Sequence, residues 1–102
     1  MSARESSLDA QVDPRFGRCR YFILADPENM SFEAYPNPAA DAAGGAGIKA
    51  AQFVVSKEAG AVIAGEVGPH ALQALEAGKV KVYTVASGTV REVLNNYKSG
   101  KL

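Results

Sequence analysis

Two glycine-rich turns, each leading straight into a helix pattern, constrain this chain more than any other feature. Residues 44–47 read Gly-Gly-Ala-Gly, and residues 65–70 read Gly-Glu-Val-Gly-Pro-His after a short apolar segment. The first turn of a helix carries backbone N–H groups without intrahelical partners, together with the positive end of the helix dipole. Two such ends side by side would form a shallow cup for an anion. The sequence therefore predicts a small binding domain.

Length and charge limit the classes of protein to which the chain can belong. Residues 1–102 suffice for a single domain with one modest core. Eleven basic and eleven acidic residues cancel, so no bulk charge would attract nucleic acid or an anionic membrane. The chain has no apolar run of roughly 18 residues, and residues 1–10 lack a signal pattern. A lone cysteine, Cys19, excludes an internal disulfide, so we expect a reduced, cytoplasmic location.

The order of the expected elements indicates an α/β fold. Residues 21–25 and 30–35 flank an Asp-Pro-Glu-Asn turn and predict an antiparallel hairpin. After a Pro/Ala-rich connector, helix and strand are expected to alternate over residues 46–60, 61–64, 69–78, 80–85 and 90–100. Short connections imply that the last two strands pair in parallel. The result would be one mixed sheet of about five strands with about three helices around it.

Apolar spacing and capping residues define the helices. Ile48, Ala51, Val54 and Val55 mark the inner face of the first helix. Pro69 suits the first position of the second helix, for which Leu72 and Leu75 supply the inner face and Gly78 the end. In the third, Thr89 and Glu92 have capping-box spacing, and Val90, Val93, Leu94 and Tyr97 form one stripe.

The expected sheet lacks a good central strand. The only candidate before the hairpin is residues 1–7, of which five are polar or charged. Such residues make a poor buried strand. We therefore expect either a very short first strand or a sheet with a weak middle.

Four motifs occur in the order typical of one family. They are residues 12–18 (Val-Asp-Pro-Arg-Phe-Gly-Arg), 44–51, 65–75 and 87–93. Through them, residues 8–102 resemble the dinitrogenase iron–molybdenum cofactor biosynthesis domain. The resemblance implies a ribonuclease H-like, three-layer α/β fold. It also implies a place among small proteins that carry cofactors in nitrogenase assembly or hold molybdenum-containing metal–sulfide clusters, some with copper.

Two positions depart from the pattern of that family. Arg15 stands where relatives often have a histidine, and an arginine does not coordinate a metal under ordinary conditions. The family also normally opens with a hydrophobic strand, whereas residues 1–7 are mostly polar.

The chemistry of such clusters selects the candidate binding residues. Metal–sulfide clusters carry net negative charge and accept hydrogen bonds at sulfur, so N–H groups, arginines and apolar walls can hold them without a metal–protein bond. Arginine supplies fixed charge and forked donors. Turns of an α/β sheet can lie together outside the carboxyl ends of its strands. The candidate cofactor-binding residues are Arg15, Phe16, Arg18, Gly45, Gly47, Ile48, Val67, Gly68, His70, Gly88 and Thr89.

Two side chains are candidate metal ligands. Cys19 would supply a soft thiolate for copper or iron, and the competing interpretation is a small apolar core residue. His70 stands in the first turn of an expected helix, where the dipole favours an uncharged ring that can coordinate a metal. The competing interpretation of His70 is an exposed polar residue. For Arg18, the alternative to an anion contact is a surface ion pair with Asp9 or Asp13.

These residues predict a non-catalytic carrier of a molybdenum-containing cluster with iron or copper, held non-covalently. Its partners would be the inorganic cluster and cofactor-assembly or acceptor proteins, with no nucleic acid and no membrane. The alternative is a nucleotide-binding module, because Gly45-x-Gly47-x-x-Ala50 matches the dinucleotide fingerprint with Glu66 about twenty residues later. Against that alternative, residues 36–43 do not form the strand that the fingerprint requires.

Two enzymatic interpretations are weaker. A catalytic pair of Cys19 and His70 has no evident third group to orient it. Nuclease activity needs metal-binding carboxylates on the strands, and the strand segments have almost none.

Overall fold

The structure is a computed structural model that describes residues 1–85 and 87–102. Within them, five strands and three helices confirm the expected α/β composition and element order. In chain order these are β1 (Ser2–Ala3), β2 (Tyr21–Ala25), β3 (Phe32–Pro36), α1 (Ala46–Ser56), β4 (Ala61–Ala64), α2 (Pro69–Ala77), β5 (Lys81–Thr84) and α3 (Val90–Lys98). None of these helices is long and apolar enough to cross a membrane.

Two sheets form, and each contains one expected pairing. β2 is central in an antiparallel sheet of order β1–β2–β3, with Tyr21 opposite Pro36 and Ala25 opposite Phe32. β4 and β5 pair in parallel, with Ala61 opposite Lys81. The predictions of an antiparallel hairpin and of a parallel pair are both confirmed.

The prediction of one mixed sheet is wrong for the described part of the chain. β1 is only two residues long, and its residues Ser2 and Ala3 pair with Phe22 and Tyr21 of β2. The chain then leaves the sheet through exposed residues 4–7. Because no longer central strand joins β2 to β4, the three-stranded and two-stranded sheets stay separate. The expectation of a very short first strand is confirmed.

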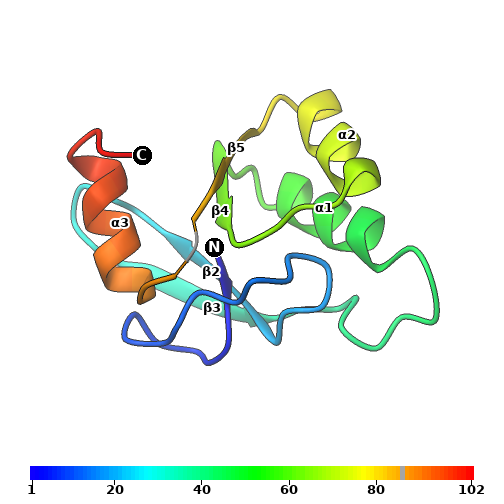
Figure 1. Ribbon diagram of the computed structural model, residues 1–102, viewed down its shortest axis with the longest axis horizontal. Coiled ribbons are helices and arrows are strands. Elements are labelled where there is room, and N and C mark those ends of the chain that lie inside the picture. The colour runs from blue at the N-terminus through cyan, green and yellow to red at the C-terminus, as the bar shows by residue number, and fades with distance from the viewer. Residues whose placement is uncertain (86) are drawn as a thin grey trace.

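The helices lie on opposite sides of the β4–β5 pair (Figure 1), with α1 and α2 together on one side and α3 on the other. α1 and α2 approach closely because Gly47 lies against Ala71, where an added Cβ would be 3.2 Å from the alanine Cβ. The inner face of α1 consists of Ala46, Ala50, Ala51 and Val54. Ile48 was expected there but is 38% exposed, since these small residues fill the contact with α2.

The capping box of α3 forms as predicted. The Glu92 N–H donates to Thr89 Oγ1 at 3.2 Å, and the Thr89 N–H donates to Glu92 Oε1 at 3.1 Å. The hydrogen bonds from Thr89 lower the pKa of the Glu92 carboxyl group. Val90, Val93 and Leu94 are buried as the apolar stripe predicts.

The buried residues fall into two clusters rather than one. The first joins Phe16 and Phe22 to α1 and α2, and the second joins Ile23 and Ile63 to α3. Domains of this size usually have one contiguous core. Each sheet contributes to both clusters, because neighbouring residues of β2 (Phe22, Ile23) and of β4 (Val62, Ile63) face opposite sides. The clusters therefore lie on the two faces of the strand layer, one beneath α1 and α2 and the other beneath α3.

Candidate functional site

A single stretch of loop, residues 12–17, touches all three glycine turns. The Val12 N–H donates to the Gly88 carbonyl at 2.9 Å, and the Glu66 N–H donates to the Pro14 carbonyl at 2.7 Å. Gly17 lies against Gly47, where an added Cβ would be 3.0 Å from the Gly47 Cα. Two of the turns follow β4 and β5 and so lie at the carboxyl ends of the parallel strands. The third, before α1, is joined to them through the contact of Gly47 with Gly17.

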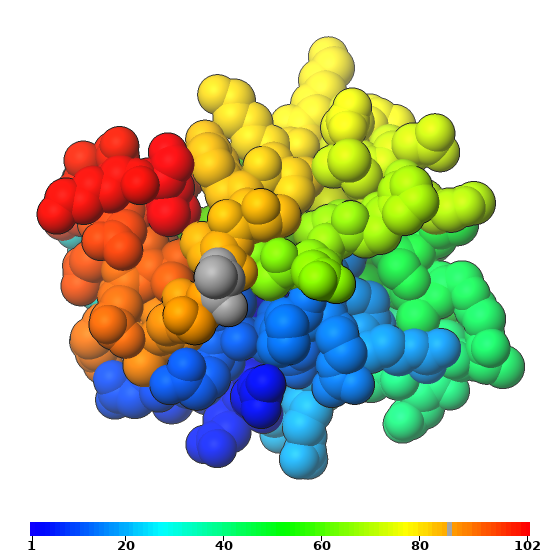
Figure 2. All heavy atoms as spheres, in the orientation of Figure 1, coloured from blue at the N-terminus to red at the C-terminus, as the bar shows by residue number. Residues whose placement is uncertain are grey.

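The same arrangement is visible on the molecular surface. In Figure 2, the blue atoms of this loop meet the yellow-green atoms that follow β4 and, further to the left, the orange atoms that begin α3. The loop therefore holds the turns together on one face of the molecule.

Gly65 is required for this contact. A Cβ at this position would lie 2.3 Å from the Cα of Pro14, closer than any real Cβ contact. The loop also runs alongside the turn, because Arg15 and Glu66 form a parallel bridge and the Phe16 N–H donates to the Glu66 carbonyl at 3.2 Å. Glycine is needed here for the close approach of two backbones.

The three helix N-termini differ in how their first N–H groups are satisfied. α1 begins at Gly45, which has φ 67°, and α2 begins at Gly68; neither N-cap makes a side-chain hydrogen bond. α3 is capped by Thr89 and by the carboxylate of Glu92. The carboxylate of Glu92 already occupies the position at the N-terminus of α3 that the helix dipole makes favourable for a negative charge. The N-termini of α1 and α2 are thus the two that an incoming anion can use, and Gly88 and Thr89 are less suited.

The backbone of Arg15 lies next to Glu66, in the turn that precedes α2. Its N–H donates to Asp13 Oδ1 at 2.9 Å, and its Nε lies 3.5 Å from the same oxygen. The Asp13 side chain is 3% exposed, whereas that of Arg15 is 67% exposed. The buried carboxylate therefore fixes the loop, and most of the guanidinium group faces outward.

Arg18 makes two hydrogen bonds that the sequence did not predict. Its Nη1 donates to the carbonyls of Ala40 and Ala42, at 3.1 and 2.6 Å. The alternative ion pair with Asp9 or Asp13 is wrong, because Asp9 pairs with Arg91 at 3.0 Å and Asp13 with Arg15. Arg18 holds the connector that leads to α1, and no sequence pattern indicates these carbonyl partners.

Asn37 is a positioning residue that the sequence analysis missed. Its Nδ2 donates to the carbonyls of Gly17 and Cys19 at 3.1 and 3.0 Å, and its Oδ1 accepts from the Ala39 N–H. An asparagine between two prolines is typical of a turn, and this was the available signal. The amide joins the connector after β3 to the Arg15 loop.

The apolar candidates separate into core and surface. Phe16 is 1% exposed and packs against Phe22 with ring centroids 5.2 Å apart. Ile48, in the first turn of α1, is 38% exposed, and Val67 before α2 is half-buried. Ile48 and Val67 are therefore the apolar side chains that flank the two open N-termini, while Phe16 supports the loop from below.

Cys19 and His70 are not brought together as a surface pair. Cys19 is 0% exposed, and its Sγ donates to the Phe16 carbonyl at 3.4 Å. Burial, with the nearby charge of Asp13 as a smaller cause, raises the pKa of the Cys19 thiol to about 12. His70 is exposed in the first turn of α2. Among the described residues, no three His, Cys, Asp or Glu side chains are grouped to hold a metal ion.

The dinucleotide fingerprint lacks its structural setting. Residues 37–45 separate β3 from α1, and β3 pairs antiparallel with β2. The fingerprint requires a strand that leads directly into the glycine turn within a parallel βαβ unit. The match at Gly45, Gly47 and Ala50 is therefore a short helix-start pattern without the surrounding unit.

The fold and this face define a small α/β domain whose candidate binding surface consists mainly of main-chain turns. Its side chains do not form a metal-ligand cluster among the described residues. The dinitrogenase iron–molybdenum cofactor family matches residues 1–100, and the chain belongs to that family.

Known proteins share the fold over nearly the whole chain. The apo form of the orange protein from Desulfovibrio gigas has a TM-score of 0.93 and 39% identity, over 98% of this chain and 85% of that chain. A putative NifB protein from Thermotoga, assigned to the DUF35 family, has a TM-score of 0.84 and 38% identity, over 99% and 86%. An uncharacterised Methanocaldococcus jannaschii protein is 26% identical over 95 residues, covering 90% of this chain and 80% of that protein.

We predict that Gly65→Ala lowers the free energy of unfolding by about 1–3 kcal/mol, the usual cost of overpacking. The new Cβ would push Pro14 away from the turn. Gly60→Ala is the matched control, because no atom lies within 4 Å of its Cβ position. Denaturant unfolding of the two variants measures the difference. Equal unfolding free energies for the two variants would show that the close approach at Gly65 does not constrain the fold.

We also predict that Cys19 resists alkylation in the folded protein. A buried thiol with a pKa of about 12 has very little thiolate at pH 8, so the reaction with iodoacetamide should be at least ~100-fold slower than in denaturant. Mass spectrometry of timed samples with and without guanidinium measures both rates. Similar rates would mean that the thiol reaches solvent and is available as a ligand.

Proposed function

We propose that this protein is a non-catalytic carrier of a molybdenum-containing metal–sulfide cluster, with iron or copper as the second metal. Membership of the iron–molybdenum cofactor family supports a role connected with such cofactors. The observation that carries the proposal is the contact of residues 12–17 with the three glycine turns, which gathers N–H donors and Arg15 on one face.

The chemistry of this face suits a polyanionic cluster. The N-termini of α1 and α2 offer main-chain N–H groups and the positive ends of two dipoles, and neither end has a side-chain cap. The guanidinium group of Arg15 adds charge-assisted donors. Ile48 and Val67 can cover the cluster and keep water from its sulfides. Binding then needs no metal–protein bond, and His70 is the exposed side chain that can add one.

The other candidates take supporting places in this proposal. Arg18 orders the connector before α1, Phe16 packs beneath the loop, and Cys19 stays in the core. Gly88 and Thr89 form the outer edge of the face, beside the Glu92 carboxylate. Protein partners would be those that assemble or accept the cluster, and the expected location is the cytoplasm. The ribonuclease H-like classification of the fold stays a prediction.

We predict that Arg15→Gln weakens cluster binding by about 10- to 100-fold, since one charge-assisted hydrogen bond contributes roughly 1.5–3 kcal/mol. Arg4→Gln is the matched control, because Arg4 is exposed in the chain just after β1. Each variant is reconstituted with tetrathiomolybdate and copper, and separately with iron and sulfide. Absorption spectra and metal analysis after desalting measure what each variant retains.

Two results would count against this assignment. Equal retention by both variants would remove the Arg15 side chain from the site and leave main-chain binding alone. Failure of the unmodified protein to retain molybdenum or iron under either condition would overturn the carrier function.

We predict that Gly68→Asp stabilises the fold and weakens cluster binding. Gly68 is the N-cap of α2 with φ −65° and ψ 163°, and no atom lies within 4 Å of its Cβ position. An aspartate there would cap α2 and gain roughly a few tenths of a kcal/mol, while its charge repels an anionic cluster. Gly68→Asn is the control that caps without charge. Thermal unfolding and cluster titration measure the two effects, and unchanged affinity in Gly68→Asp would exclude the N-terminus of α2 from the site.

A further inference from the structure

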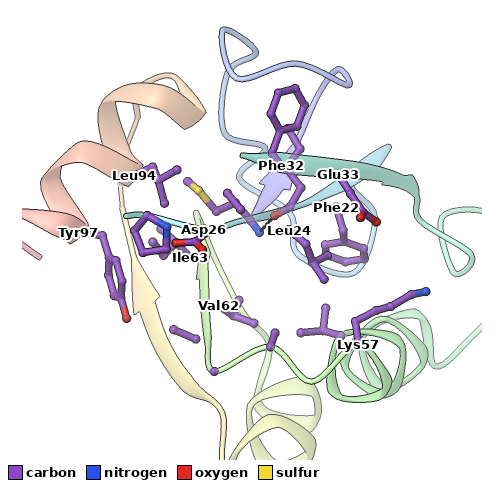
Figure 3. A pocket seen from close by; sticks show the side chains of 18 of the residues that line it. Phe22, Leu24, Asp26, Phe32, Glu33, Lys57, Val62, Ile63, Leu94 and Tyr97 are labelled. Atoms are coloured by element: carbon purple, nitrogen blue, oxygen red, sulfur yellow. Dashed lines mark hydrogen bonds between the residues drawn. The ribbon is translucent and has the colours of Figure 1, made fainter. Parts of the chain in front are cut away.

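The helix α1 is held by aromatic contacts at its C-terminal end. Phe53 stacks on Phe22 of β2 with ring centroids 5.9 Å apart, and Lys57 Nζ lies 4.4 Å from the centre of the Tyr35 ring. Figure 3 shows Lys57 at this end of the helix, with Phe22 above it. These contacts lie far along the helix from Gly45, so the N-terminal end of α1 depends on other support.

The N-terminal end of α1 is reached through the connector, residues 37–45. Residues 43–45, directly before the helix, are exposed. No atom lies within 4 Å of the Cβ positions of Gly44 and Gly45, so this segment is not crowded by its surroundings. Gly45 has φ 67°, one of several conformations that glycine adopts readily. The entry to α1 therefore has little packing of its own.

The beginning of the connector is anchored in the core. The Asn37 N–H donates to the Arg20 carbonyl at 2.9 Å, and its Nδ2 donates to the carbonyls of Gly17 and Cys19. Ala39, next but one along the chain, is 0% exposed. The connector is thus fixed as far as Ala39 by uncharged contacts, and the part that follows needs a separate tie.

Arg18 supplies the tie to the middle of the connector. Its Nη1 donates to the Ala40 carbonyl at 3.1 Å and to the Ala42 carbonyl at 2.6 Å. Within residues 1–85 and 87–102, no other side chain hydrogen-bonds to residues 40–45. Both bonds are charge-assisted and lie at the surface, so they can open without exposing a buried group. They act as a latch on the connector.

The latch limits how much chain can move ahead of α1. With Ala42 held by Arg18, residues 43–45 are the free part, whereas without the latch the free part is residues 40–45. A longer free segment has more conformations to lose when it becomes ordered. Opening of the latch would therefore fray the first turn of α1, in which the Lys49 N–H makes a main-chain hydrogen bond of 3.0 Å.

We propose that Arg18 is a positioning residue of the candidate cluster site and acts through the connector rather than by touching the cluster. It latches Ala40 and Ala42 and thereby keeps the first N–H groups of α1 in place for an anion. The identity of that anion rests on the proposed carrier function, whereas the latch is a property of the cluster-free protein. Both bonds come from one nitrogen, so a lysine ammonium, with three rotatable donors, can make the same contacts.

The first test measures amide hydrogen exchange in the cluster-free protein. Arg18→Met keeps the apolar stem and removes the donors, Arg18→Lys retains donors, and Arg20→Met is the charge-matched control at another exposed arginine. Exchange at Ala42 and Lys49 should be about five- to tenfold faster in Arg18→Met and unchanged in the other two variants. Exchange at Leu94 in α3 should stay the same in all variants, because the opening is local.

The second test separates positioning from direct contact with the cluster. Reconstituted with tetrathiomolybdate and copper, Arg18→Met should bind the cluster about fivefold more weakly than Arg20→Met does. Gly44→Ala, added to Arg18→Met, should recover at least about twofold of this loss. An alanine restricts the connector at a position with open space, but it cannot replace a positive charge beside the cluster.

Three outcomes would overturn the proposal. Unchanged exchange at Ala42 and Lys49 in Arg18→Met would show that the latch does not hold the start of α1. Equal acceleration at Leu94 would show a general loss of stability instead of a local opening. A loss of affinity that Gly44→Ala leaves unchanged would assign Arg18 to direct contact with the cluster.

The failure of the carrier function would be visible separately. If the unmodified protein retains no cluster, the proposed function is wrong, while faster exchange at Ala42 and Lys49 in Arg18→Met would still establish that Arg18 positions the start of α1. The exchange measurement therefore tests the latch independently of the cluster.

Discussion

The hydrogen bonds and close backbone contacts between residues 12–17 and the glycine turns determine which turns share one face of the molecule. They bring the turns after β4 and β5 and the start of α1 onto one face. The contact depends on backbone lying on backbone at Gly65 and Pro14, which leaves no room for a side chain. Without this contact, the open N-termini of α1 and α2 would be separate features of the surface rather than parts of one candidate site.

Side-chain capping decides which parts of that face can take an anion. All three helices begin beside the loop, yet α3 satisfies its own N-terminus through Thr89 and Glu92. α1 and α2 begin at glycines, whose lack of a side chain leaves the first N–H groups for another acceptor. This difference leaves the N-termini of α1 and α2, rather than that of α3, as the positive helix ends open to an anion.

Local sequence signals predicted the helices and strands well, but they did not predict which distant residues contact one another. Short-range patterns of neighbouring residues predicted three features: the capping box at Thr89, the start of α2 at Pro69 and the β2–β3 hairpin. The partners of Arg18 are carbonyls more than twenty residues away, and no residue type encodes a carbonyl acceptor. Ile48 was misplaced for a similar reason: the face of α1 that is buried is set by the close contact of Gly47 with Ala71, which lies in another element.

Ser2 links the short first strand β1 to the loop that presents Arg15. The Ser2 carbonyl accepts from the Asp13 N–H, and Ser2 Oγ donates to the Asp13 carbonyl at 2.8 Å. The Asp13 side chain in turn accepts from the Arg15 N–H. On the other side of Ser2, Met1 packs against the buried cluster that contains Ile63. The order of the candidate binding face is therefore expected to depend on β1, because Ser2 and Asp13 make the contacts that join the two.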